Sequence, residues 1–157
     1  MVAMIELVEK SEANLATWLS TMWIEYHADL LAAGMSIDEA DKNVERNRAT
    51  LLDGERPSLG QHIFDVVSDG DVVGILWLGH QPSRAPNEWF IYNIAIDEGR
   101  RGTGLGRATM VAAEEYVRSK SGTRLGLNVF GANTVARRLY ESLDYQTMSV
   151  SMYKDLP

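Results

Sequence analysis

The hydrophobic and polar positions of this 157-residue chain follow two different periods, and each period predicts a different kind of element. Residues 4–9 alternate apolar and polar side chains, which predicts a short strand. Over residues 14–34 the apolar side chains recur every three or four positions, which predicts a helix that ends at Gly34. The segment SIDE at 36–39 is a capping box, so a second helix is expected from Ser36 to about Leu52.

Strands dominate the pattern after this point. Residues 62–68 and 71–79 are rich in Val and Ile and are joined by Asp-Gly, which predicts a β-hairpin. The other expected elements are a strand over 89–96, helix 107–120, strand 124–130, helix 133–143 capped by Asn133, and one or two closing strands over 145–154. This order predicts a mixed α/β (α+β) fold in one domain, residues 1–157, with a mostly antiparallel central sheet and about four helices.

Composition narrows the possible functions before any motif is considered. The chain has no cysteine, which excludes disulfides, thiolate metal sites and a cysteine nucleophile, and we expect no bound metal. Residues 1–12 show no basic segment leading into an apolar run, and no stretch approaches the ~18 apolar residues of a membrane span. We therefore expect a cytoplasmic protein with no membrane partner.

The net charge of −7 is unevenly distributed along the chain. Residues 1–98 hold 17 Asp and Glu against 6 Lys and Arg, whereas residues 99–157 hold 5 against 9. Overall acidity argues against a nucleic-acid partner. The asymmetry has two open interpretations: ordinary solvated surfaces, or a basic half that meets an anion and an acidic half that meets a cation.

The stretch GRRGTGLGRA at 99–108 follows the apolar strand 89–96 directly. A strand, a glycine-rich turn and a helix together suit phosphate, because the first helical amides lack partners and the helix dipole adds positive charge. Gly102, Gly104 and Gly106 alternate, so several amides can face one pyrophosphate. The spacing does not fit a dinucleotide G-x-G-x-x-G motif, and no lysine completes a Walker loop. A tight turn with incidental glycines is the remaining alternative.

Two motifs resemble those of the GNAT superfamily of acetyl-CoA-dependent N-acetyltransferases. Arg101, Gly104 and Gly106 match its acyl-CoA loop, [RQ]-x-x-G-x-[GA]. The segment NTVARRLYESLDY at 133–145 resembles N-x-x-A-x-x-L-Y-x-x-x-G-[FY], with Asp144 in place of glycine, and Asp tolerates the left-handed conformation expected there. The resemblance implies a sheet splayed between its fourth and fifth strands, where the pantetheine arm enters. It implies cofactor contacts from Ile94, Ala95, Ile96, Arg101, Gly102, Thr103, Gly104, Leu105, Gly106, Arg107, Asn133, Ala136 and Tyr140.

The implied reaction is direct transfer of an acetyl group from acetyl-CoA to a primary amine in a ternary complex, which needs no enzyme nucleophile. The reaction needs a neutral amine, a donor for the oxyanion and a proton for the departing thiolate. Tyr140 is the candidate acid, because a phenol with a pKa near ~10 is protonated at neutral pH. The backbone amide of Ile94 is the candidate oxyanion donor, provided that a bulge in its strand frees it.

The general base is not identified by the motifs. Family members carry a glutamate at positions that correspond to Phe90 or Asn128 here, and neither residue is a carboxylate. Glu88 shares a strand face with Phe90 in a regular strand and is the candidate base, acting through water. An amine that enters neutral, or that loses its proton to a water chain, is equally open, and the weaker side-chain candidates are Asn93, Tyr92, Glu25 and His27.

The acidic front half fits a small cationic amine or a peptide amine as acceptor. The resemblance places the acceptor against the two front helices and the loop 80–88, where Trp18, Trp23 and Tyr26 either line the site or belong to the core. Because no base carboxylate is evident, the alternative function is a non-catalytic acyl-CoA-binding regulatory module on the same fold. A homodimer is left open.

Overall fold

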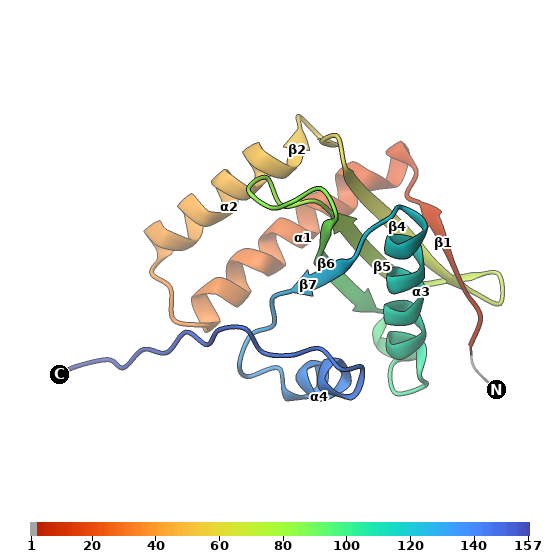
Figure 1. Cartoon of the computed structure of the whole chain (residues 1–157). Helices are drawn as coiled ribbons and strands as arrows, with labels where there is room; N and C mark the ends of the chain where they lie inside the picture. The colour runs from red at the N-terminus through yellow and green to blue at the C-terminus, as the bar shows by residue number, and fades with distance from the viewer. Residues whose placement is uncertain (1–2) are drawn as a thin grey trace.

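A five-stranded sheet in the order β1-β4-β5-β6-β7 lies at the centre of the computed structural model, which describes residues 3–157 (Figure 1). The first two residues of the predicted domain lie outside the described part. The elements are β1 (Ile5–Glu9), α1 (Glu12–Ala32), α2 (Ile37–Leu51), β2 (Leu52–Asp53), β3 (Arg56–Pro57), β4 (Gln61–Ser68), β5 (Asp71–Gly79), β6 (Glu88–Ile96), the 3₁₀ turn η1 (Glu98–Arg100), α3 (Leu105–Ser119), β7 (Arg124–Leu127) and α4 (Thr134–Ser142).

Strand pairing follows the predicted mixture of directions. β1, β4, β5 and β6 are antiparallel neighbours, and β7 runs parallel to β6. The β4–β5 hairpin turns at Asp69 and Gly70, which have φ of 52° and 83°, as a two-residue turn with left-handed residues requires. The predicted fold class, a mostly antiparallel sheet flanked by four helices, is confirmed.

Successive strand residues point to opposite faces of the sheet, and a hydrophobic cluster covers each face. On one face, Phe64 and Leu76 pack with Met110 of α3. On the other face, Ile63 and Trp77 pack with Trp23 of α1. Of the aromatic stripe predicted either to line a site or to form core, Trp23 is buried, and Trp18 and Tyr26 pack partly buried against the same cluster. The stripe on α1 is therefore mainly core.

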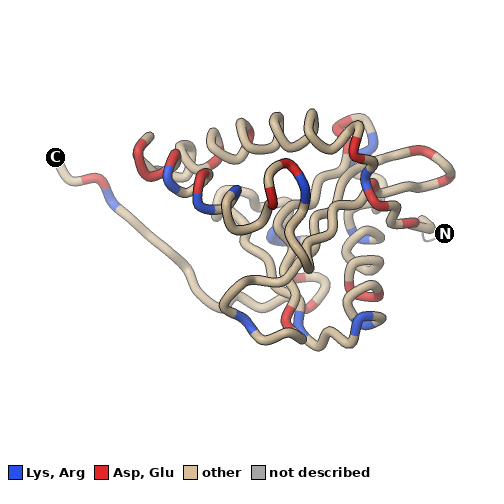
Figure 2. The backbone as a smooth tube through the Cα atoms, turned by 90° about the horizontal axis from the view of Figure 1, so that it is seen from above, with Lys and Arg blue, Asp and Glu red and all other residues tan. Residues whose placement is uncertain are grey.

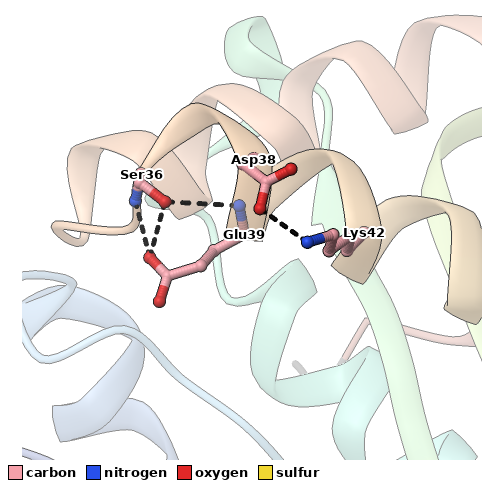
Figure 3. Close-up of polar contacts among 4 residues, drawn as sticks. All are labelled: Ser36, Asp38, Glu39 and Lys42. Carbon is pink, nitrogen blue, oxygen red and sulfur yellow. Dashed lines mark hydrogen bonds and ion pairs between the residues drawn. The ribbon is translucent and has the colours of Figure 1, made fainter.

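Helix α2 begins at the predicted capping box (Figure 3). The backbone N–H of Ser36 donates to Glu39 Oε2 at 2.9 Å, and the Glu39 N–H donates to Ser36 Oγ at 3.3 Å. The helix is tied to α1 by the Tyr26 hydroxyl, which donates to Asn43 Oδ1, and by His27 Nε2, which lies 2.8 Å from Asp41 Oδ1. His27 thus serves the packing of two helices.

The C-terminal segment departs from the prediction. Residues 145–154 were expected to form closing strands, but they form no strand. Tyr145 and Met148 still contact Glu114 and Arg124, and the chain then continues to the C-terminus as an extended tail (Figure 1). Met148, Val150 and Met152 are 72–89% exposed. Alternation indicates which side chains would share a face, but a strand also needs a partner edge, and no neighbouring strand pairs with this segment. β7 also ends at Leu127 rather than at residue 130, and the short β2–β3 pair was not anticipated.

Charged residues are interspersed along helices and loops rather than separated into two surfaces (Figure 2). Several arginines of the basic half pair with carboxylates, including Arg100 with Asp71 and Arg118 with Glu114. Such exposed pairs contribute little to stability, but they favour the interpretation of solvated surfaces over that of two opposed fields. No helix within residues 3–157 combines the length and apolar character that crossing a membrane requires.

Candidate functional site

The sheet opens between β6 and β7, the fourth and fifth strands of the main sheet. Glu88–Ile91 pair with Arg124–Leu127, and beyond Ile91 the two strands separate. β6 continues to Ile96 beside β5 alone. Within residues 3–157, the edge of β6 that carries Ile94, Ala95 and Ile96 therefore has no partner strand on the β7 side. This is the splay that the sequence resemblance implied.

The glycine loop connects this open edge to α3. Gly102 and Gly104 have φ of 73° and 85°, in the left-handed region that favours glycine, and a Cβ at either position would meet no atom within 4 Å. The Thr103 hydroxyl donates to the Arg100 carbonyl at 2.7 Å and closes the turn. The loop therefore presents an open surface built of backbone.

Helix α3 begins without a side-chain cap. Its N-cap is Gly104, its first turn contains no acidic residue, and its first helical bond in this region runs from the Ala108 N–H to the Gly104 carbonyl. The amides of Leu105, Gly106 and Arg107 precede that bond, so they have no intrahelical partner. Together with the helix dipole, they form a surface that suits an anion.

The arginine side chains of the loop are used to hold the loop itself. Arg100 pairs with Asp71 at 3.0 Å, and Arg101 Nε donates to the Ile96 carbonyl at 2.9 Å. Arg107 donates to the hydroxyl of Ser142 on α4. The partners of Arg101 and Arg107 are neutral groups, so in residues 3–157 neither guanidinium charge is paired with a carboxylate.

The predicted helix with Tyr140 is present as α4. Asn133 Oδ1 accepts from the Ala136 N–H at 3.2 Å, which confirms the predicted cap. Tyr140 is partly buried, and burial raises the pKa of its phenol above the usual value. The Tyr145 hydroxyl donates to Glu114 Oε1 at 3.2 Å, and its N–H donates to the Tyr140 carbonyl. Asp144 between them has a φ of 66°, the left-handed conformation expected at this position.

A cavity of about 860 Å³ brings some of the predicted residues together. Glu88, Phe90, Asn128 and Tyr140 all contribute to its lining, from β6, the end of β7 and α4. The Glu88 carboxylate lies 3.9 Å from Arg84 and 3.7 Å from Arg124, so it is flanked by two cations. Ile94 and the glycine loop are not among the residues that line this cavity.

The strand β6 contains a bulge two positions before Ile94. Trp77 of β5 pairs with Asn93, but the next residue, Leu78, pairs with Ile91, so Tyr92 is the extra residue. Sequence reasoning named Tyr92 only as a weak base candidate and gave no role to its neighbour Gln61. Their partners lie 12–19 positions away along the chain, so no local signal could have revealed the contacts.

Comparison with known families agrees with this geometry. The model of the acetyltransferase (GNAT) family matches residues 16–145. The chain belongs to the GNAT acetyltransferase family. The match includes the glycine loop, the open edge of β6 and all of α4, so the motifs identified in the sequence lie within the family's own domain.

Two relatives are bacterial proteins named N-acetyltransferases. YycN of Bacillus subtilis is 36% identical over 96 residues, which cover 60% of this chain and 62% of that protein, less than two thirds of its length. YdgE of the same organism is 30% identical over 119 residues, which cover 75% of this chain and 76% of that protein. The crystal structure of YycN superimposes with a TM-score of 0.87 over 98% of this chain and 99% of YycN, at 27% identity.

The fold also occurs in a more distant enzyme. AAC(6')-Iy, in complex with a bisubstrate analogue that joins CoA to acetylneamine, has a TM-score of 0.59. The alignment covers 98% of each chain at 12% identity, so it is a likeness of fold alone.

Proposed function

We propose that this protein transfers an acetyl group from acetyl-CoA directly to a primary amine in a ternary complex. The observation that carries the proposal is the open edge of β6, which leads straight into the uncapped N-terminus of α3. An elongated ligand with a pyrophosphate at one end and an amide-bearing arm at the other matches these two features in order. Acetyl-CoA is such a ligand.

The fit rests on backbone groups of this chain. The pyrophosphate would accept hydrogen bonds from amides between Arg101 and Arg107, since the left-handed glycines leave that space free. The pantetheine arm would pair with Ile94–Ile96 as an added strand. Asn133 and Ala136, at the start of α4, would flank the end of the arm. The AAC(6')-Iy complex supports this use of the fold, because its ligand contains CoA.

The transfer chemistry would fall to groups near the splay. The amine nitrogen forms a bond to the thioester carbonyl carbon, and the bond from that carbon to sulfur breaks. The Ile94 amide would donate to the carbonyl oxygen while it carries negative charge. Tyr140 would give its proton to the departing sulfur, and its raised pKa keeps that proton in place until it is needed.

The amine must lose one proton before or during attack, because a free alkylamine is mainly charged at neutral pH. We assign the acceptance of that proton to Glu88 through an intervening water, on the ground that Glu88 and Tyr140 line the same cavity. Arg84 and Arg124 would hold the Glu88 carboxylate in position. A small cationic amine or a peptide amine is the proposed acceptor.

The proposal is tested by incubating the purified protein with acetyl-CoA and a panel of amines, and following free thiol. The panel contains a polyamine, an aminoglycoside, a lysine peptide and a peptide with a free N-terminus. The expected result is thiol release that depends on at least one amine. If acetyl-CoA raises the melting temperature but no amine releases thiol, the alternative of a non-catalytic acyl-CoA-binding module is favoured. A melting temperature unchanged by acetyl-CoA would contradict both functions.

A further inference from the structure

The bulge in β6 lies where the sheet opens. Ile91 is the last residue of β6 that pairs with β7, and Tyr92 is the extra residue of the bulge. Ile91 and Ile94 both pack towards the α3 side, whereas Tyr92 packs against Trp77 on the α1 side. The bulge thus lets Ile94, three positions after Ile91, return to the same face. Whatever holds Tyr92 therefore also sets the position of the open edge.

Tyr92 is held by a buried polar network from three strands. Its hydroxyl donates to the His80 carbonyl at 3.0 Å, and Gln61 Nε2 donates to the same carbonyl at 2.7 Å. Gln61 Oε1 in turn accepts from Trp77 Nε1 at 3.1 Å. Gln61 is 9% exposed and Trp77 is 1% exposed, so little water competes for these bonds.

The space for this network is reserved by a glycine. A Cβ at Gly79 would collide with the Gln61 amide, so only glycine at the end of β5 allows Gln61 to reach the His80 carbonyl. The ring of His80 closes the other side of the loop, since its Nδ1 lies 3.1 Å from the Glu88 carbonyl. That carbonyl can only accept, so the bond requires a proton on Nδ1. His80 therefore joins the end of β5 to the start of β6.

We propose that Tyr92 is a positioning residue: with Gln61, it fixes the β6 bulge and the His80–Glu88 connection, and thereby the amide of Ile94 and the carboxylate of Glu88. This inference rests on the proposed function, in which both groups act on the reacting atoms. It also gives Tyr92 a role other than that of a base. Burial raises the pKa of Tyr92 to about 12, partly opposed by the Gln61 amide, so the hydroxyl remains a donor.

The test is Tyr92→Phe, compared with Tyr116→Phe as a matched control. Phenylalanine keeps the ring that packs on Trp77 and Phe90, and the His80 carbonyl keeps its bond from Gln61, so the fold is retained. Tyr116 is a partly buried tyrosine of α3 that packs against Phe64 and Trp89, outside the proposed machinery. Both variants lose one hydroxyl, but only Tyr92→Phe releases the bulge.

For Tyr92→Phe we expect kcat to fall about tenfold while the Kd for acetyl-CoA changes less than about twofold, because a small misplacement of reacting groups affects turnover more than binding. The pH–rate profile should keep its shape, and amide hydrogen exchange of residues 88–96 should accelerate. Tyr116→Phe should leave all four readouts unchanged.

Three kinetic or binding results would overturn the inference: a kcat equal to that of Tyr116→Phe, a limb of the pH–rate profile that disappears, or a Kd that weakens as much as kcat falls. Exchange does not depend on turnover. If the wild-type protein acetylates no amine, the proposed function fails, but the exchange measurement can still be made. Equal amide hydrogen exchange over residues 88–96 in the two variants would refute the role of Tyr92 in fixing the bulge.

Discussion

The N-termini of α2 and α3 are built in opposite ways within one chain. Ser36 caps α2, and the side chains of Ser36 and Glu39 each accept a hydrogen bond from the other's backbone amide (Figure 3). α3 begins at Gly104, which offers no side chain and leaves the amides of its first turn open. The first arrangement stabilises a helix, and the second leaves amides free for the pyrophosphate that we propose to bind there. The missing cap of α3 is informative because it coincides with a glycine loop and the open edge of β6.

The largest effect is expected from giving α3 a cap of its own. Gly104→Asp places a carboxylate where the first-turn amides would hold the pyrophosphate, so it both occupies those donors and repels the ligand. We expect the Kd for acetyl-CoA to weaken by about 100-fold or more, which corresponds to about 2.7 kcal/mol. Calorimetric titration measures this directly.

The matched control is Gly99→Asp, which adds the same charge to the same loop. A Cβ at Gly99 lies in open space, and its φ is not in the left-handed region. The control should bind acetyl-CoA nearly as the wild-type protein does. Equal affinities for the two variants would refute the assignment of the α3 amides to the pyrophosphate.

The next largest effect is expected at Tyr140, where a substitution should lower turnover without weakening acetyl-CoA binding. Tyr140→Phe removes the proposed proton donor but leaves the loop intact, so kcat should fall by about 10² while acetyl-CoA binds as before. Stopped-flow or steady-state assays with the best amine of the panel measure the loss. If turnover is unchanged when chemistry limits the rate, Tyr140 is not the acid.

A smaller effect, on stability alone, is expected at the capped helix. Ser36→Ala removes the acceptor of the Glu39 amide, so the free energy of unfolding should fall by about 1 kcal/mol, with no change in acetyl-CoA affinity. Ser11→Ala is the control, because Ser11 precedes α1 without a side-chain cap bond. Urea denaturation of both variants tests the difference. Equal losses would show that the capping box contributes nothing.

The smallest effect is expected on the pH dependence of stability, because the capping box contains the Glu39 carboxylate. Hydrogen bonds from the backbone and side chain of Ser36 hold the pKa of Glu39 below its usual value. A carboxylate with a lowered pKa in the folded state contributes stability above its ordinary pKa of 4.5, and the contribution is lost as pH falls below that value. The Tm difference between wild type and Glu39→Gln should therefore shrink on acidification. A difference independent of pH would contradict this.

The sequence was most informative where a local pattern decides the structure. The capping box at Ser36, the Asp69-Gly70 turn and the glycine loop all depend on residues close together in the chain, and each formed as predicted. The local pattern over 133–143, with Asn133 as cap, also predicted α4. The resemblance of 133–145 to the family motif added only the candidate acid, Tyr140, which neighbouring residues alone could not have identified.

The remaining features depend on contacts between distant residues. The alternation over 145–154 was sound as a pattern, but a strand also needs a neighbour to pair with. The bulge at Tyr92 arises from its register against β5, and the Gln61 network joins three strands. Neither the bulge nor the network produces a recognisable pattern in the nearby sequence, so both could be identified only from the structure.

The central claim, direct transfer in a ternary complex, is tested most directly by initial velocities measured while acetyl-CoA and the accepted amine are varied together. Mass spectrometry of the protein mixed with acetyl-CoA alone completes the measurement. Direct transfer predicts double-reciprocal lines that intersect, and no acetylated protein that forms and decays during turnover. Parallel lines together with an acetyl-enzyme that disappears when amine is added would contradict it.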